Sequence, residues 1–431
     1  MPAGERSSFE RRLRNHLARH AHDVRVKPSA DAREGRRPPG QRSSTDLAER
    51  LRAELGGEVV RGPAGAFVRI EGEAHRLPLD RTRLERLPGG PPADAPLICL
   101  DTETTGLGSA AGTVAFLIGL GWWSGQSFRQ VQLLLPDHGD EPAFLAALAE
   151  FVPATGWLVT YNGRGFDWPL IATRFRMAHR PPPAVGGHMD LLGLVRGVFR
   201  HRLSDGRLGT VERELLGIVR EPDIAGYQIP ARYLGFLQDG RARELVDVVR
   251  HNDEDVRSLA RLLAHAQDAL GDPAAWQRLP AGDLLGLARA YRREGRLSVA
   301  LDCLEAAIDG ARAGDAAARP AERATLELAG VERARLLRRL GYVEGALAAW
   351  SALALAGGRL AAVAWIEIAK IREHEERNPM GALEAADAAA RVAERARLLG
   401  RPLPRLESDL ARRKRRLRRH LARSTGSARG P

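Results

Sequence analysis

The chain has 431 residues, of which 44% are hydrophobic and 28% are charged, so it is long enough for two or three globular domains. It contains no apolar run of the length that a membrane span needs, and the polar segment from Met1 to Arg25 is not expected to be a secretory signal. The formal net charge of +12 favours a polyanionic partner such as nucleic acid.

Residue usage bears on the partner and on the compartment. Only Lys27, Lys370 and Lys414 are lysines among the 66 basic residues, and this preference for arginine is typical of a codon bias. Arginine abundance alone is therefore weak support for phosphate binding. The two cysteines, Cys99 and Cys303, lie far apart in the sequence. A reducing, cytoplasmic location with both as small buried residues is the simplest expectation.

Residues 1–44 are predicted to be a disordered, basic N-terminal tail, because Arg, Ser, Pro and Gly dominate them. The histidines in this tail have no accompanying Cys or carboxylate framework, so a solvated tail is favoured over a metal site. Residues 45–95 are predicted to be a small module and linker. The module begins with a capped helix over 45–56, and two short alternating stretches then predict a hairpin around 62–65.

Residues 96–271 are predicted to be an α/β domain with a mixed five-stranded sheet and helices on its faces. Three strands joined by tight turns indicate an antiparallel meander, which alternating strands and helices follow. The predicted strands begin at residue 97 and then cover 113–123, 128–135, 157–160 and 186–192, and the main helices cover 141–151, 168–177 and 247–266.

The first strand of this domain leads into two carboxylates in the segment Asp101-Thr102-Glu103-Thr104-Thr105-Gly106-Leu107-Gly108. Alternate residues of a strand face the same side, so Asp101 and Glu103 are expected side by side. Two like charges this close repel unless a cation separates them, and carboxylate oxygens suit Mg²⁺ or Mn²⁺. A D-x-E pair alone, however, is more typical of a strand that ends in an acidic turn.

Two later segments also carry chemistry. Asn162-Gly163-Arg164-Gly165-Phe166-Asp167 follows a strand and opens a helix, so Asp167 is an N-cap, a metal ligand, or both. His251 and Asp255 are four residues apart in a helical stretch and therefore share one face. An imidazole titrates near neutral pH, which suits a general base. A histidine on the helix surface is the alternative interpretation of His251.

These motifs, in this order, resemble those of the DnaQ-like 3′–5′ exonucleases, the DEDD group of the ribonuclease H-like superfamily. The resemblance implies that two divalent ions, Mg²⁺ or Mn²⁺, lie about 4 Å apart between Asp101, Glu103, Asp167 and Asp255. It implies that His251 is the general base. It also implies that the substrate is contacted by Thr105, Gly106, Leu107, Asn162, Arg164 and Phe166. The histidine departs from the group, because it stands at the four-residue spacing of the tyrosine branch and not at the five-residue spacing of the histidine branch.

Three further segments resemble the YprB-like ribonuclease H-like proteins, which join a DnaQ-like domain to helical repeats. The resemblance covers residues 46–270 well. The segments are His188-Met189-Asp190-Leu191-Leu192, Gly209-Thr210-Val211-Glu212-Arg213, and His251-Asn252-Asp253-Glu254-Asp255-Val256. Within them, Asp190 is expected to be structural, and Glu212 is expected to pair locally with Arg213.

Residues 278–400 are predicted to form an all-α helical-repeat domain. Paired helical stretches with Gly295 or Gly341 between them resemble tetratricopeptide repeats, although the units are unevenly spaced. A generic α-helical domain is the alternative, and either would offer a surface to another protein or to the preceding domain. Residues 401–431 are predicted to be a basic tail or helix, which either contacts nucleic acid or is solvated.

The motifs together predict a metal-dependent 3′–5′ exonuclease that hydrolyses single-stranded ends of DNA or RNA. Two alternatives remain open. One is a non-catalytic nucleic-acid-binding protein on the same fold, which the unusual histidine spacing would favour. The other is a scaffold in which the helical repeats bind a protein partner and carry the function. No association with a membrane is expected.

Overall fold

The structure is a computed structural model that describes residues 44–106, 112–220, 224–313 and 320–427. The tail predicted for residues 1–44 therefore lies outside the described residues, apart from Ser44, which begins a helix. Within the described ranges, no helix combines the length and the apolar character that crossing a membrane requires.

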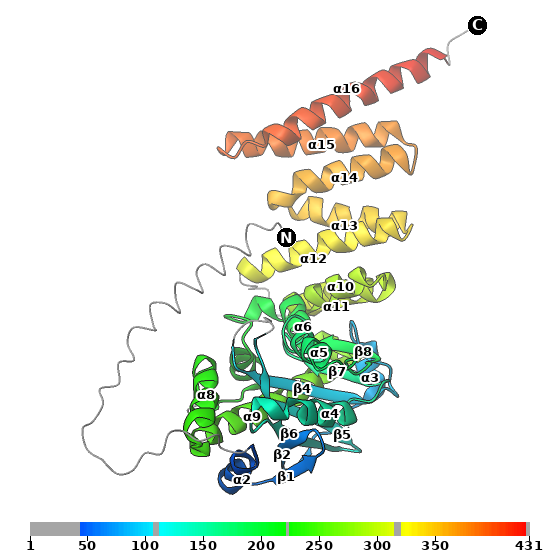
Figure 1. Cartoon of the computed structure of the whole chain (residues 1–431). Helices are drawn as coiled ribbons and strands as arrows, with labels where there is room; N and C mark the ends of the chain where they lie inside the picture. Colours follow the sequence, from blue (N-terminus) through cyan, green and yellow to red (C-terminus); the bar gives the residue numbers. More distant parts are fainter. Residues whose placement is uncertain (1–43, 107–111, 221–223, 314–319, 428–431) are drawn as a thin grey trace. The chain divides into compact units, whose positions relative to one another are not determined.

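A mixed sheet of eight strands lies at the centre of the N-terminal half of the described residues (Figure 1). Its spatial order is β1-β2-β6-β5-β4-β7-β8, and β3 pairs with β6. As predicted, β4, β5 and β6 form an antiparallel meander, while β7 and β8 continue the sheet in parallel on the other side of β4. The strands are β1 (Glu58–Gly62), β2 (Gly65–Glu71), β3 (His75–Arg76), β4 (Leu97–Thr104), β5 (Ala115–Ser124), β6 (Ser127–Leu134), β7 (Trp157–Thr160) and β8 (Gly187–Asp190).

The sheet is larger than the five strands predicted, because strands of the N-terminal module extend it. The predicted hairpin is present, with Gly62 paired to Gly65, and β2 pairs antiparallel with β6. A strand at the edge of a sheet has unpaired backbone N–H and C=O groups. Strand β2 satisfies those of β6 and places Phe67 in the same hydrophobic cluster as Phe116 of β5.

Helices cover both faces of this sheet, and the residues of β4 show how the two faces divide. Ile98 and Leu100 belong to one hydrophobic cluster, whereas Leu97 and Cys99 belong to another, as alternation along a strand requires. Helix α9 packs on the second face and α5 on the first. The helices are α2 (Ser44–Leu55), α3 (Arg81–Arg86), α4 (Glu141–Phe151), α5 (Asp167–Met177), α6 (Leu191–Val198), α7 (Leu208–Val211), α8 (Ile229–Asp239) and α9 (Val246–Leu270).

The C-terminal region consists of helices that contact one another in chain order (Figure 1). Gly295 and Gly341 lie between α10 and α11 and between α12 and α13, and both adopt a positive φ, which glycine tolerates without strain. The resemblance to tetratricopeptide repeats remains a prediction. The helices are α10 (Ala281–Arg293), α11 (Leu297–Ala313), α12 (Pro320–Arg339), α13 (Val343–Ala356), α14 (Ala361–His374), α15 (Pro379–Leu398) and α16 (Pro404–Ser427).

The first helices of this region pack on the sheet-containing part of the chain. Helix α10 contacts α6, and its Leu284 and Tyr291 are buried in the same cluster as Leu97 of β4. The Tyr291 hydroxyl donates a 2.9 Å hydrogen bond to the carbonyl oxygen of Arg86. One core therefore extends across residues 271–278, where the sequence predicts a boundary between domains. That division remains a prediction.

Both cysteines are buried, as predicted, Cys99 in β4 and Cys303 in α11. Burial raises the pKa of each thiol well above its usual range. Both side chains therefore remain protonated at neutral pH and pack as small apolar residues.

Candidate active site

Strand β4 presents the two acids of the first motif on one face of the sheet. Asp101 and Glu103 share the face of Cys99, which α9 covers. Thr102, between the two acids, faces the other side, and its hydroxyl donates a hydrogen bond to the carboxylate of Asp167 at the start of α5. The side-by-side position of the two acids is the one that alternation predicts.

Asp101 has the other three predicted acids around it. Burial raises the pKa of Asp101 well above its usual range, and the negative charges of Asp255, Glu103 and Asp167 raise it further. Burial also raises the pKa of Asp167, to about 6, and raises that of Asp255. Like charges shift a pKa in this way only when they are close. Acids from three separate motifs therefore lie within electrostatic reach of one another.

His251 lies between two of these acids. Its Nε2 is 3.9 Å from Oε1 of Glu103 and 3.8 Å from Oδ2 of Asp255. His251 and Asp255 share a face of α9 because they are four residues apart in the helix. The side chain of His251 is 17% exposed, so it remains accessible to water. An imidazole in this position can exchange a proton with a water molecule among the acids.

Two glycines allow α9 to approach the sheet closely. Gly119 of β5 lies opposite Asp101 of β4. A Cβ atom at Gly119 would collide with the side-chain oxygen of Asn252 and would lie 2.6 Å from Cγ2 of Val256. A Cβ atom at Gly121 would lie 2.9 Å from Cγ1 of Val256. Glycines within a buried strand often mark such a close approach, a signal that did not enter the prediction of the site.

Asn252 links α9 directly to Asp101, although the sequence did not single it out. The side chain is completely buried. Its Nδ2 donates a 2.9 Å hydrogen bond to Oδ2 of Asp101, and its Oδ1 accepts a 2.9 Å bond from Nε2 of Gln132. The same Gln132 nitrogen also donates to the carbonyl oxygen of Val249 at 2.8 Å. Because both ends of the buried amide are bonded, Asn252 holds the carboxylate of Asp101 in one orientation.

Arg220 is a second contributor that the sequence did not reveal. Its guanidinium contacts the carboxylates of Glu212 and Asp255, and its Nε lies 3.7 Å from Oε2 of Glu254. The side chain of Arg220 is only 13% exposed. A buried charge is unfavourable without a partner, so this arginine and its acids depend on one another for their charged state.

The predicted local pair between Glu212 and Arg213 is wrong. Glu212 is buried, whereas Arg213 is exposed to solvent. Arg213 instead contacts Glu214, with 3.0 Å between nitrogen and oxygen. Glu212 is turned inward to Arg220.

The turn after β4 contains the first of the predicted substrate contacts. Thr105 and Gly106 form this turn, which the hydroxyl of Thr104 closes by a 2.6 Å hydrogen bond to the carbonyl oxygen of Gly106. Leu107, which is also predicted to contact the substrate, lies outside the described residues. Phe166, which is partly buried, stands immediately before α5.

Asn162 and Arg164 are held in place by Asp190. Their backbone amides donate hydrogen bonds to its carboxylate at 2.8 and 3.1 Å, and the guanidinium of Arg164 bonds to the carbonyl oxygen of His188. Asp190 also caps α6 by accepting from the amide of Leu192, in keeping with the structural role predicted for it. Asn162 and Arg164 also line a hollow of about 540 Å³ next to α6 and α10.

The donor atoms of the site fit a hard divalent cation. Within the described ranges, no three His, Cys, Asp or Glu side chains are arranged to hold a metal ion as they stand. The chemistry nevertheless matches, because the four acids offer only carboxylate oxygens, the ligands that Mg²⁺ and Mn²⁺ prefer. Burial and the neighbouring acids raise the pKa of Asp101, so its ionised form is unfavourable without a counter-ion, whereas Asp255 already has Arg220 as a partner.

Comparison with known proteins places this geometry in a family. Residues 98–267 match the family model of the RNase_H superfamily. The chain is also 32% identical over 297 residues to the protein titled "Uncharacterized protein YprB" from Bacillus subtilis (strain 168), and the alignment covers 68% of each chain. The chain belongs to the YprB family. It carries a nuclease-like domain of the RNase H superfamily, and the predicted ribonuclease H-like fold followed by many helices is confirmed.

The close packing of α9 against the sheet of this YprB-family protein can be tested by substitution of Gly119. We expect Gly119→Ala to lower the free energy of unfolding by about 1–3 kcal/mol, the usual cost of overpacking a core, because its methyl group displaces Asn252 and Val256. Urea unfolding followed by circular dichroism measures the change. Gly193→Ala is the matched control, since a Cβ atom at Gly193 in α6 meets nothing within 4 Å. Equal stabilities of the two variants would contradict the argument.

Proposed function

We propose that this protein is a metal-dependent 3′–5′ exonuclease that releases nucleoside 5′-monophosphates from single-stranded ends of DNA or RNA. The observation that carries the proposal is the convergence of Asp101, Glu103, Asp167 and Asp255, with His251 between two of them. The RNase H superfamily domain supports nuclease chemistry. The net charge of +12 supports a polyanionic substrate.

The four acids would hold the cations. In this proposal Asp101, Glu103, Asp167 and Asp255 bind two Mg²⁺ or Mn²⁺ ions through their carboxylate oxygens. When bound, the ions supply Lewis-acid polarisation of the phosphate and neutralise the charge that develops on it. The ions would also offset the burial and the mutual repulsion that raise the pKa of Asp101.

The chain's own side chains orient the acids and move the proton. His251 accepts a proton from the water that attacks the terminal phosphodiester. Asn252 fixes the carboxylate of Asp101, and the hydroxyl of Thr102 fixes that of Asp167. Each acid thus keeps one orientation as the substrate enters. Such preorganisation lowers the barrier because no side chain has to reorient during the reaction.

Metal-dependent removal of nucleotides from the 3′ end tests the proposal. Single strands of DNA and RNA with the same sequence are labelled at the 5′ end and incubated with the protein and Mn²⁺. We expect progressive shortening of one or both strands, loss of shortening in excess chelator, and recovery when Mg²⁺ or Mn²⁺ is returned, because the acids then regain their counter-ions. Undiminished hydrolysis in excess chelator, or internal cuts alone, would contradict the mechanism.

A further inference from the structure

The last helix, α16, buries leucines on one side within the fold. Leu410 and Leu417 on this side are 3% and 1% exposed. The partly buried Leu406 packs against the hydrophobic cluster that contains Leu410. Helix α16 contacts α15 along this side. The predicted basic tail is thus, over residues 404–427, a helix packed onto the helical region.

Ion pairs fix the position of α16 on the helices next to it. Arg413 and Arg416 both contact Glu373 near the end of α14. Nζ of Lys414 lies 2.6 Å from Oδ1 of Asp387 in α15. Because buried leucines and these pairs hold the helix together, its remaining cations project from a fixed scaffold.

A second set of arginines on α16 has no acidic partner within the described part of the chain. Arg415, Arg419 and Arg423 follow one another at four-residue intervals and therefore share one face of the helix, about 6 Å apart along its axis. All three side chains are exposed. Three unpaired guanidinium groups in a row repel one another, which favours the binding of a counter-ion with several negative charges.

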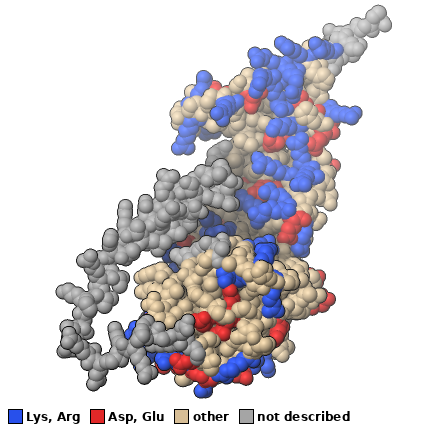
Figure 2. Space-filling view, viewed as in Figure 1, with Lys and Arg blue, Asp and Glu red and all other residues tan. Residues whose placement is uncertain are grey.

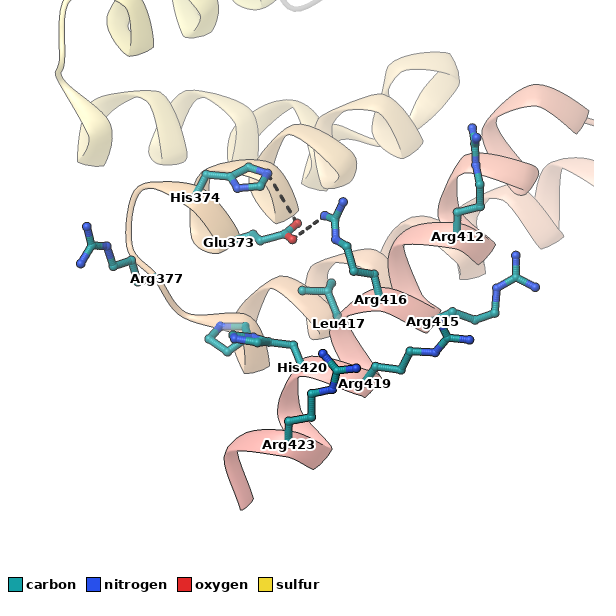
Figure 3. Close-up of a pocket in the computed structure, with 11 residues that line it drawn as sticks. Glu373, His374, Arg377, Arg412, Arg415, Arg416, Leu417, Arg419, His420 and Arg423 are labelled. Carbon is teal, nitrogen blue, oxygen red and sulfur yellow. Dashed lines mark hydrogen bonds and ion pairs between the residues drawn. The ribbon is translucent and has the colours of Figure 1, made fainter. Parts of the chain in front are cut away.

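These arginines border a hollow between α16 and the turn from α14 to α15 (Figure 3). The hollow has a volume of about 860 Å³, and Arg377 of the turn lies on its opposite side. Glu373 is the one acid among its lining residues, and two arginines already contact it. Figure 2 shows that Lys and Arg gather over this end of the helical region. The arginines that line the hollow are Arg377, Arg412, Arg415, Arg416, Arg419 and Arg423.

We propose that the α16 surface, formed by Arg377, Arg415, Arg419 and Arg423, binds the phosphate backbone of a nucleic acid. Guanidinium groups donate paired hydrogen bonds to phosphate oxygens. A row of regularly spaced cations suits a polymer of regularly spaced phosphates, each of which releases its counter-ions on binding. The surface contains no residue of the candidate active site, so it is a binding site in addition to the proposed nuclease centre.

A membrane surface and a protein partner fit the α16 surface less well than a nucleic acid. A helix that lies in a membrane interface needs a free apolar face, whereas Leu410 and Leu417 of α16 are buried in the fold. A protein partner is usually anchored by aromatic or aliphatic side chains that enter a pocket. The side chains around this hollow are mainly arginine and histidine, and its leucine, Leu417, is buried.

Binding of a labelled single strand to the full-length protein tests the inference. The strand has about 20 nucleotides, which exceeds the length of one binding site, and excess chelator prevents its cleavage. Fluorescence anisotropy gives the dissociation constant over a range of salt concentrations. For the triple variant Arg415→Gln, Arg419→Gln and Arg423→Gln we expect about tenfold weaker binding. We also expect a slope of log K against log salt that is shallower by about 2, since each lost contact removes about 0.7 from a single strand.

Two variants make the result specific to this surface. A control protein with Arg323→Gln, Arg335→Gln and Arg391→Gln loses the same charge from exposed positions on α12 and α15, and its slope should remain near that of the wild type. Lysine in place of the three α16 arginines should retain most of the slope, because the charge remains. Equal losses in the α16 and control variants would overturn the inference. So would binding of phosphatidylserine vesicles, but not of the strand, through the α16 arginines.

Discussion

Asp101→Asn is expected to lower the rate of strand hydrolysis by more than about 100-fold. Loss of a residue that merely supports a metal ligand already costs about 10–100-fold. Asp101 is the acid whose pKa responds to all three of the others, so its loss removes a proposed ligand from the middle of the set. Single-turnover hydrolysis of an end-labelled strand in saturating Mn²⁺ measures the effect.

The same substitution should raise the stability of the metal-free protein near neutral pH. Burial, followed by Asp255, Glu103 and Asp167, raises the pKa of Asp101, so its ionised form is less favourable in the folded than in the unfolded protein. The stabilising contribution of this carboxyl group is complete below its ordinary pKa of about 4 and is lost as the pH rises through the raised value. Asparagine carries no charge and avoids that loss. Thermal unfolding in chelator should therefore occur at a higher temperature in the variant.

Asp253→Asn is the matched control for the hydrolysis measurement. Asp253 lies on α9 next to the site residues, but its carboxylate contacts Arg257 and Gln130. We expect this variant to hydrolyse the strand at nearly the wild-type rate. If Asp101→Asn remained active, or unfolded at a lower temperature than the wild type in chelator, Asp101 would be a structural residue and not a ligand.

His251→Ala is expected to lower turnover by roughly 10²–10⁴-fold, the usual contribution of a general base, and to leave metal binding largely intact. An imidazole must be neutral to accept a proton. Turnover of the wild type should therefore rise with pH as the neutral fraction of the imidazole increases. This rise should be absent from the pH profile of His251→Ala, measured with saturating Mn²⁺.

The contribution of Asp167 has to be separated from that of His251 in this profile. Burial raises the pKa of Asp167 to about 6, so in the absence of metal this carboxyl group loses its proton near pH 6 and also contributes to the pH dependence. Bound Mn²⁺ keeps carboxylates ionised, which moves their titration to lower pH. A rise that persists in His251→Ala would then belong to the acids, and a loss of less than about tenfold would indicate a histidine without a role as base. A wild type without turnover would favour a non-catalytic binding protein.

The sequence by itself determined the regular elements and the acids that they carry. Alternation along β4 places Asp101 and Glu103 on one face of the sheet. The four-residue spacing along α9 places His251 and Asp255 on one face of that helix. Helix α4 spans Glu141–Phe151, as predicted. These features depend on the periodicity of the backbone within a single element, so neighbouring residues are sufficient to predict them.

Only the tertiary structure decided which side chains support the acids. The hydrogen bond from Asn252 to Asp101 joins residues 151 positions apart, and the pair of Arg220 with Asp255 joins residues 35 apart. The first contact depends on how closely α9 approaches the sheet, and that distance depends on the absence of a side chain at Gly119. A glycine in a buried strand marks a close approach, but it does not identify the side chains that come near.

The extent of the sheet and the packing of the helical region were likewise decided in three dimensions. The sequence shows that β2 and α10 each have an apolar face that must be buried, but periodicity does not identify the partner that covers it. In the folded chain β2 pairs with β6, and α10 packs against α6. In each contact two apolar surfaces from distant parts of the sequence cover one another. Together they remove apolar surface from water that neither element can bury alone.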